Sequence, residues 1–279
     1  MLSPREKYLF DVQGALVVPN VLSSDEVAAL NNALDANQHL RSELEDETMD
    51  ESALAGTPRL EYWNTMEWPK PWCEPFRDLV AHPRVRPYLD GLLGRGWHID
   101  HVPEVFEFTP GAQGHAIHFG HHWIHPGVWY RTAGEQLRNG VVVVTFALTD
   151  QPAGNGGFCF IPGSHKSVFP RPDGLGTSED TEILRNPEVR AGDAIIFTEG
   201  VAHGALPWRN QHNRRVAIFR YAAKTVQYGP GIHSVTFPDW VSELTDAQRA
   251  AFEPAHFYER PVIAADGLVT TVWDDYDRP

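Results

Sequence analysis

Short apolar runs separated by turn residues dominate the second half of the chain. They cover residues 141–148, 158–161, 194–197 and 216–221, and an earlier run lies within 102–108. Most of the glycines and prolines sit between these runs. Short strands with this kind of turn punctuation are typical of a β-sandwich or β-barrel.

Helical patterns come mainly from the first third of the chain. Apolar positions predict a short helix over residues 3–12, a strand over 15–18, and a helix that Ser23 or Ser24 caps. Further helices are predicted over 83–93 and over 245–252, the last with Thr245 as its cap. We therefore predict a mainly β fold with flanking helices.

No repeat or linker divides the chain, so we expect residues 1–279 to form a single domain with helices at its N-terminus. Residues 42–52 carry six acidic side chains and few large apolar ones. Such a stretch is typical of a solvated surface loop, and the alternative is a lid that orders over a substrate.

The charge balance excludes one class of partner. With 23 Lys and Arg against 37 Asp and Glu, the formal net charge is −14. Nucleic-acid polymers are bound mostly by cationic side chains that neutralise phosphates, so we expect no such partner. The chain has no run of 18 apolar residues, no apolar secretion signal and only two cysteines, which favours a cytoplasmic protein without a membrane span. Nothing in the composition points to an oligomeric state.

Histidine is the unusual residue. The chain has 14, and five of them lie between His115 and His125. Neutral imidazole binds iron, zinc, copper and nickel, and the common non-haem Fe(II) site combines two His with one carboxylate. On a strand, residues i and i+2 face the same side, so a His-x-Asp pair can reach one ion.

Two segments offer such a pair. His98-Ile99-Asp100 has the carboxylate, whereas His118-Phe119-Gly120 lacks it. The second, distant histidine is best placed at His203, just after the apolar run 194–197. We interpret His101, His165, His212 and His233 as surface or structural residues, with His165 in a turn.

Several blocks of the sequence resemble the phytanoyl-CoA dioxygenase family. Phe108-Thr109-Pro110-Gly111 resembles the approach to that family's first iron ligand, and residues 155–166 are similar to its central strand and turn. Residues 191–197, followed by His203-Gly204 and Arg214, resemble its last block, and residues 7–37 its opening elements. The resemblance implies a double-stranded β-helix, that is, a cupin-like jelly roll, which uses Fe(II) and 2-oxoglutarate to activate O2.

The resemblance also implies roles for individual residues. His118 and His203 would ligate iron, and Arg214 would pair with the distal carboxylate of 2-oxoglutarate, for which its fork of donors is suited. Thr145 would contact 2-oxoglutarate or simply bond to backbone. Arg215 is expected on the opposite face of the strand, where it could be an exposed surface charge or have a functional role.

Gly120 departs from the family's pattern, which has Asp or Glu two residues after the first His. In 2-oxoglutarate-dependent halogenases Gly or Ala replaces this carboxylate and chloride takes its place, because removing the carboxylate leaves both room and charge balance for an anion. The substrate radical formed by hydrogen abstraction then combines with chloride instead of hydroxide. We therefore predict a halogenase that chlorinates an unactivated C–H bond, with Gly120 as the determining catalytic position.

Three alternatives stay open. A hydroxylase would complete its iron site with water, Glu107 or a histidine among His115, His121 and His122; a conventional site would use His98 and Asp100; and a relative without catalysis would only bind a ligand. Retention of His203 and Arg214 speaks against the last.

A long active-site loop is predicted around residues 109–137. From it we expect Phe119, His121 and Arg131 to contact the substrate, while Trp129 and Tyr130 form pocket wall or core. Aromatic and cationic groups of this kind suit a small polar molecule, such as a nucleoside, a nucleotide or another natural-product precursor.

Overall fold

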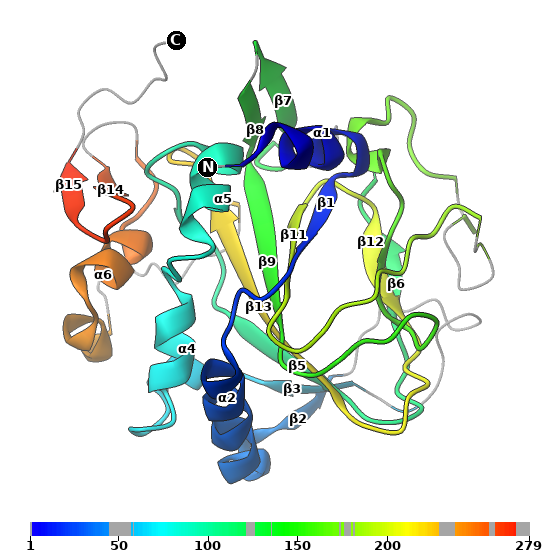
Figure 1. The fold of residues 1–279 in the computed structure, drawn as a ribbon, viewed down its shortest axis with the longest axis horizontal. Coiled ribbons are helices and arrows are strands. Elements are labelled where there is room, and N and C mark those ends of the chain that lie inside the picture. The colour runs from blue at the N-terminus through cyan, green and yellow to red at the C-terminus, as the bar shows by residue number, and fades with distance from the viewer. Residues whose placement is uncertain are drawn as a thin grey trace.

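Two antiparallel sheets face each other in the computed structural model, as Figure 1 shows. The structure describes residues 2–44, 57, 59–120, 126–134, 136–172, 174, 175, 180, 182–228, 238–256 and 260–271.

The larger sheet has eight strands, and seven of them follow the order β1-β11-β9-β13-β5-β3-β2, while β4 also pairs with β13. Their bounds are β1 Ala15–Val18, β2 Ser42–Leu44, β3 Arg59–Tyr62, β4 His98–Ile99, β5 Glu104–Phe108, β9 Val141–Ala147, β11 Ala194–Thr198 and β13 Arg214–Ala222.

The smaller sheet has the order β10-β12-β6. It consists of β6 His115–His118, β10 Gly157–Phe160 and β12 His203–Leu206. Two further hairpins lie outside the sheet pair: β7 Tyr130–Ala133 with β8 Gln136–Asn139, and β14 Pro261–Ile263 with β15 Val269–Thr271. The predicted mainly β jelly roll is confirmed.

Helices flank the larger sheet. They are α1 Pro4–Gln13, α2 Ser24–Ala36, α4 Glu74–Leu79, α5 Arg86–Leu93 and α6 Asp246–Phe252, with 3-10 turns η1 Gln38–Leu40, η2 Thr65–Glu67, η3 Ser164–Lys166 and η4 Asp239–Glu243. Helices α1, α2 and α6 each begin with a reciprocal capping box, in which Ser3, Ser23 and Thr245 satisfy free N–H groups of the first turn. The predicted caps of α2 and α6 are thus confirmed.

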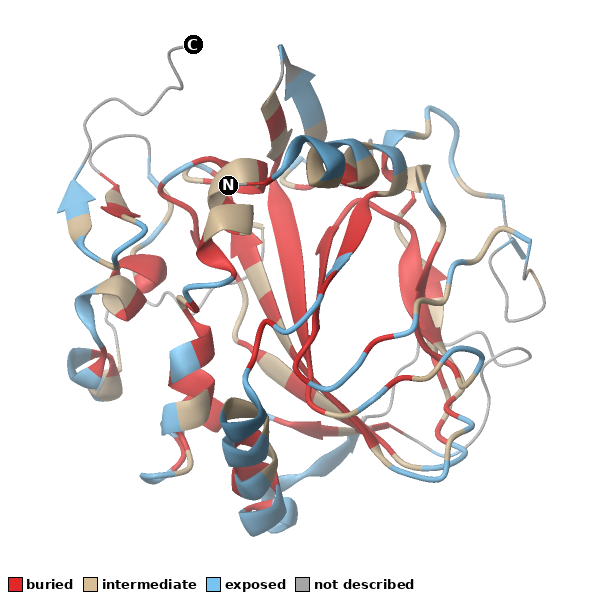
Figure 2. Ribbon diagram, in the orientation of Figure 1, coloured by how far each residue is buried: buried red, intermediate tan, exposed pale blue. Residues whose placement is uncertain are grey.

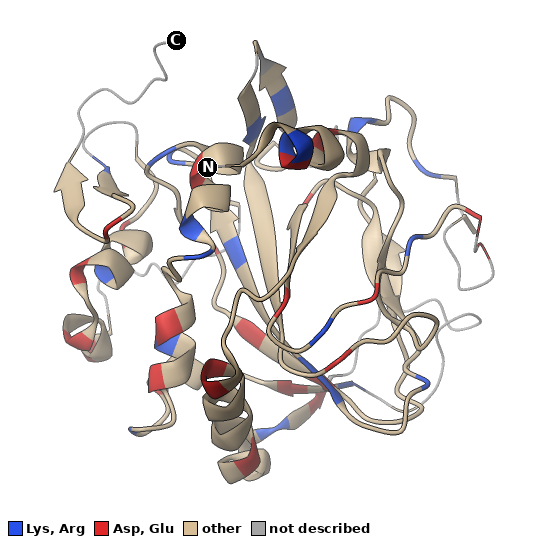
Figure 3. Ribbon diagram, viewed as in Figure 1, with Lys and Arg blue, Asp and Glu red and all other residues tan. Residues whose placement is uncertain are grey.

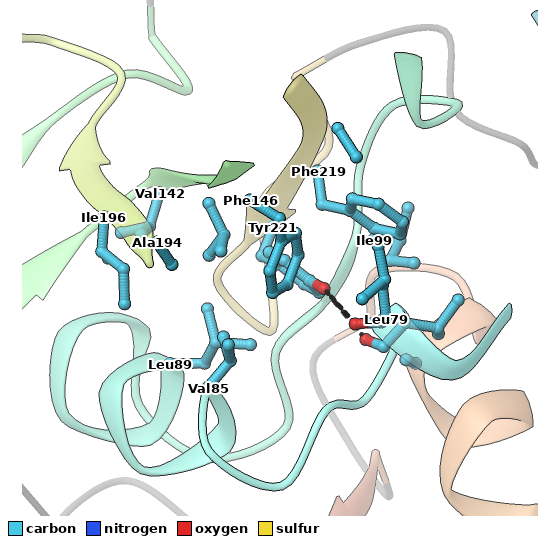
Figure 4. Close-up of a cluster of buried hydrophobic side chains, with 14 of the residues drawn as sticks. Leu79, Val85, Leu89, Ile99, Val142, Phe146, Ala194, Ile196, Phe219 and Tyr221 are labelled. Carbon is cyan, nitrogen blue, oxygen red and sulfur yellow. Dashed lines mark hydrogen bonds between the residues drawn. The ribbon is translucent and has the colours of Figure 1, made fainter. Parts of the chain in front are cut away.

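Strand β9 is apolar on both faces because it is covered on both. Val142, Val144 and Phe146 pack with the helices, whereas Val143 and Ala147 face the space between the sheets. Figure 2 shows β9 buried along its length, and Figure 4 shows Phe146 beside Phe219 and Tyr221 in the helix-facing cluster. The hydroxyl of Tyr221 donates to the backbone oxygen of Val80 at 3.0 Å, which links β13 to the end of α4.

The predicted loop around residues 109–137 contains more regular structure than expected. Strand β6, all of β7 and the start of β8 fall within it. These strands lack the apolar alternation that marks a half-buried strand, since β6 reads His-Ala-Ile-His and β7 reads Tyr-Arg-Thr-Ala. The acidic stretch 42–52 begins as the edge strand β2, and its residues from 45 onward lie outside the described part of the chain.

Charged side chains lie along the helices and also on the strands at one side of the larger sheet, β2, β3, β5 and β13. Figure 3 shows acidic positions along α2, α4 and α6, uncharged strands β9 and β11, and charged positions on β13 and β5. Within the described residues, no helix combines the length and apolar character needed to span a membrane.

Truncating Phe146 to Ala tests the helix-facing core. The side chain is fully buried and its ring meets Phe219 edge to face at 5.6 Å. We expect Phe146→Ala to lower the free energy of unfolding by about 3–5 kcal/mol in urea titrations, since the transfer and cavity terms add. The control Val17→Ala removes a half-exposed side chain from β1 and should cost less than about 1 kcal/mol. Equal losses for both would contradict this packing.

Candidate active site

Two histidines meet where β6 pairs with β12. His118, at the end of β6, lies directly across from His203, at the start of β12. Their ring centroids are 4.2 Å apart. The register of the pair shifts between His203 and Ala205, and this irregularity lets His115 and His118 both reach the space between the sheets.

Backbone oxygens fix both rings in the same tautomer. Nδ1 of His118 lies 3.0 Å from the oxygen of Ala116, and Nδ1 of His203 lies 2.7 Å from that of Val201. A carbonyl can only accept, so each Nδ1 carries the hydrogen and each Nε2 keeps a free lone pair. Burial lowers the pKa of both histidines to about 3, which keeps the rings neutral.

The position two residues after His118 has no side chain to offer. Gly120 has a φ of 106°, and a Cβ added there would lie 2.7 Å from Cβ of Ala202. The preceding Phe119 also has a positive φ, 59°, and its ring stacks on that of His203 at 5.8 Å. Within the described residues, no third His, Cys, Asp or Glu joins the two histidines in a metal-binding group.

A cavity of about 200 Å³ extends from the two histidines between the sheets. Its walls combine aromatic and aliphatic side chains with a few polar ones. The polar lining consists of Arg59, His115, His118, Thr145, His203, Arg214 and Arg220. The cavity therefore contains all four residues predicted to bind iron and 2-oxoglutarate.

Arg214 reaches the cavity from the first residue of β13. Its Nε donates to Oε1 of Gln151 at 2.9 Å, and its guanidinium stacks on the ring of Phe108 at 4.8 Å. Gly157 makes room for this contact, since a Cβ there would lie 2.8 Å from the Arg214 Nε. Burial lowers the pKa of Arg214 to about 10, so the group stays cationic at neutral pH.

No described carboxylate pairs with Arg214, although its side chain is almost fully buried. A buried cation without a counter-charge is costly, and its fork of donors matches a carboxylate. Thr145, opposite Ile218 in the sheet, lines the same cavity and is also buried. Two neutral imidazoles at one end and a guanidinium at the other fit an iron ion and a dicarboxylic oxoacid, respectively.

Two charged residues that line the cavity, Arg59 and Arg220, did not emerge from the sequence. Arg59, on β3, is buried and its guanidinium lies 5.4 Å from the ring centroid of Phe106. Arg220 donates to Glu104 at 3.0 Å and lies 3.7 Å from a carboxylate oxygen of Glu199. A charged residue within a predicted strand is usually interpreted as facing solvent. Because every second residue of a strand faces the same side, Arg220, six residues after Arg214, could have been predicted to face the cavity as Arg214 does.

The alternative iron pair His98 and Asp100 is used structurally. Both ring nitrogens of His98 contact backbone oxygens, of Ile99 at 3.0 Å and Val226 at 2.9 Å. Asp100 accepts from the backbone N–H of Tyr228 at 2.7 Å. Neither residue lines the cavity, so this alternative is wrong.

Glu107 also fails as an iron ligand. It faces the other side of the sheet, where the Tyr62 hydroxyl donates to it at 2.9 Å and Arg215 lies 3.3 Å away. Arg215 is itself buried and forms a 2.7 Å ion pair with Asp35. The interpretation of Arg215 as an exposed charge is therefore wrong.

The remaining residues from the sequence fall in different places. Phe119 lies on the histidine pair, as described above, whereas Arg131 is exposed on β7, stacked on Trp129 at 4.8 Å. His121 and His122 lie outside the described residues. His165 is buried in η3 against Tyr130, which confirms the prediction of a structural turn residue.

Comparisons with known proteins support this picture. The family model described as phytanoyl-CoA dioxygenase matches residues 10–216. No functionally curated protein matches the sequence.

Among solved structures, HygX from Streptomyces hygroscopicus with nickel and 2-oxoglutarate bound superposes with a TM-score of 0.68 at 19% identity, covering 82% of this chain and 91% of that one. The epimerase SnoN from nogalamycin biosynthesis gives 0.60 at 21% identity, covering 81% and 85%. AviO1 from Streptomyces viridochromogenes Tue57 gives 0.58 at 19%, covering 80% and 96%. At these identities the likeness concerns the fold.

Removing either central histidine should abolish metal binding. We expect His118→Ala and His203→Ala each to weaken Ni(II) binding by more than about 100-fold in calorimetric titrations, since even loss of a supporting partner costs roughly 10–100-fold. His39→Ala, an exposed control on η1, should bind as the wild type does. Tight Ni(II) binding by both cavity variants would show that the metal binds elsewhere.

Exchanging the cation at the far end should weaken 2-oxoglutarate binding without affecting the metal. We expect Arg214→Lys to lose about tenfold or more in affinity for 2-oxoglutarate, because a charge-assisted hydrogen bond contributes roughly 1.5–3 kcal/mol. Arg214→Gln should lose more. Titration of 2-oxoglutarate into the Ni(II)-loaded protein measures this, with Arg209→Lys as the exposed control. Unchanged affinity in Arg214→Gln would refute the assignment.

Proposed function

The chain belongs to the phytanoyl-CoA dioxygenase family, and we propose that it is a halogenase that chlorinates an unactivated C–H bond. Its class is that of the Fe(II)- and 2-oxoglutarate-dependent oxygenases. When bound, iron with 2-oxoglutarate and O2 supplies the power to abstract a hydrogen atom from an unactivated C–H bond. The choice between halogenation and another oxidation depends on which side chains would bind the metal.

In this proposal, different residues of the cavity bind the metal, bind 2-oxoglutarate and exclude water. His118 and His203 would hold the metal through Nε2, while their Nδ1 hydrogens stay fixed to backbone oxygens. Arg214 would hold the distal carboxylate of 2-oxoglutarate, with the Thr145 hydroxyl beside it. The aromatic walls formed by Phe106, Phe108, Phe158 and Phe197 exclude water from the space between them.

One observation supports halogenation over hydroxylation: the position that normally carries the metal-binding carboxylate is Gly120, and no described residue replaces it. With only two neutral protein ligands, one coordination position of the metal would stay open, and one unit of its positive charge would not be balanced. A chloride ion would satisfy both. A carboxylate at residue 120 that reached the metal would compete for this position and repel the halide.

A different oxidation of the substrate is the second candidate. A Cβ at residue 120 would point to Ala202, and Gly120 borders a cavity other than that of the two histidines. In a hydroxylase, Gly120 would serve only the close packing of the loop against Ala202, and water would be the remaining ligand of the metal. The structural neighbours include an epimerase and a carbocyclase, which supports an oxidative outcome other than halogenation.

The substrate we propose is a small polar natural-product precursor. Several neighbours belong to such chemistry by their names, since SnoN and SnoK come from nogalamycin biosynthesis and HygX has been solved with hygromycin B. The cavity volume of about 200 Å³ suits a small molecule, and its lining mixes aromatic rings with polar groups.

A halide titration distinguishes the two candidates without knowing the substrate. We expect chloride and bromide to shift the visible absorption of the anaerobic Fe(II)- and 2-oxoglutarate-loaded protein, each to a different extent, because the halide enters the metal's coordination shell. The double variant Gly120→Asp with Ala202→Gly, which relieves the 2.7 Å contact, should lose this response.

Ala202→Gly alone is the matched control and should keep the response. A wild-type spectrum that neither halide changes would favour the second candidate.

A further inference from the structure

The smaller sheet forms one wall of the cavity from the histidine pair to Arg214. Along β12, His203 lies across from His118, and Leu206, three residues later, pairs with Gly157 of β10. Gly157 is the position whose missing side chain makes room for the Arg214 Nε. The two ends are therefore roughly 10 Å apart along this strand, at about 3.3 Å per residue. An extended oxoacid bound to the metal and to Arg214 would lie along this wall.

His115 occupies the middle of the same wall. It pairs with Ala205 of β12, and Phe158 of β10 pairs with Ala205 from the other side. All three residues line the cavity, so the imidazole of His115 is accessible to a molecule bound there. Its ring centroid lies 4.8 Å from that of His118. His115 therefore lies between the histidine pair and Arg214, beside the end that would hold the metal.

The wall around His115 has no other polar side chain. Between the two ends, the smaller sheet lines the cavity with Gly204, Ala205 and Phe158. A carboxylate that leaves water needs hydrogen-bond donors for its oxygens. Imidazole carries at least one N–H whether it is neutral or protonated, and a hydrogen bond to an ionised acceptor is among the stronger ones. His115 is thus the side chain of this wall that can donate to the oxoacid end of a cosubstrate.

We propose that His115 donates a hydrogen bond to the oxoacid end of 2-oxoglutarate and so fixes the orientation of the cosubstrate; this rests on the proposed oxygenase function. Contacts at the metal and at Arg214 hold the two ends of the molecule but leave it able to turn about its long axis. A third contact between them removes this freedom, and such positioning lowers the entropy cost of the later reaction.

The proposed halide position lies on the other side of the histidine pair. A Cβ at Gly120 would contact Ala202, which precedes His203, whereas His115 pairs with Ala205, which follows it. The halide and the oxoacid would therefore lie on different sides of the metal. Within the described residues, no group of three such side chains is arranged to bind a metal, so His115 is assigned to the cosubstrate.

Binding of 2-oxoglutarate to variants of His115 tests the proposal. His115→Phe keeps a ring but removes the donor, and we expect it to lower the affinity of the Ni(II)-loaded protein for 2-oxoglutarate about tenfold in calorimetric titrations. His115→Gln keeps an N–H donor and should stay within about threefold of the wild type. His39→Phe makes the same exchange at an exposed position and should change nothing. The affinity for Ni(II) should be unchanged in all three variants.

The visible absorption of the anaerobic protein with Fe(II) and 2-oxoglutarate separates this role from that of Arg214. The absorption depends on the oxoacid group at the metal, so loss of the His115 donor should shift its maximum. Arg214→Gln removes a contact with the distal carboxylate. At saturating 2-oxoglutarate it should therefore leave the maximum in place, although it weakens binding.

An unchanged affinity or an unchanged absorption maximum in His115→Phe would overturn the proposal, and so would equal losses in His115→Gln and His115→Phe. Loss of Ni(II) binding in both His115→Phe and His115→Ala would also overturn it, because His115 would then be needed for the metal and not for the cosubstrate. Failure of the wild type to bind Ni(II) or 2-oxoglutarate would instead refute the proposed function, and these affinities are measured separately.

Discussion

The pairing of β6 with β12 is the constraint on which the site depends. It places His118 opposite His203, and the backbone oxygens that fix both rings come from Ala116 within β6 and from Val201 just before β12. Because Nδ1 donates within each histidine's own strand or turn, each Nε2 keeps a free lone pair, and the two ring centroids lie 4.2 Å apart. The ring of Phe119 then packs on His203 from the chain that leaves β6. A slip of one residue in this register would turn a histidine out of the cavity.

The larger sheet contributes rigidity and the opposite wall. Since β9 and β13 are buried on both faces, the inward positions Thr145 and Arg214 are held by packing on the outer face as well as by their own contacts. The period of two along β13 also sets Arg214 and Arg220 on the same side, at opposite ends of the cavity. One strand thereby supplies an arginine to each end of the cavity.

The sequence predicts the strands, turns and helix caps that local residue patterns determine. The apolar run at β9, the turn before β11 and the caps of α2 and α6 are all local signals, and they led to His203 and Arg214 through the resemblance. Strand β6 could not be predicted from the apolar pattern, because its first and last residues are histidines that line the cavity and do not pack in an aliphatic core. From the sequence, Arg215 is interpreted as an exposed charge and Glu107 as an alternative iron ligand, whereas the sheet brings them together as a buried pair. Glu199 follows a strand end, where a turn residue is expected, yet it is buried and lies 3.7 Å from Arg220, a residue distant in the sequence.

The central claim is a metal held by two histidines and by no carboxylate of the chain. Iron K-edge X-ray absorption of the anaerobic protein with Fe(II) and 2-oxoglutarate, recorded in chloride and in bromide, tests it most directly. We expect two imidazole scatterers and one halide scatterer, whose distance and backscattering change between the two salts. A shell made only of nitrogen and oxygen, unchanged by the halide, would contradict it.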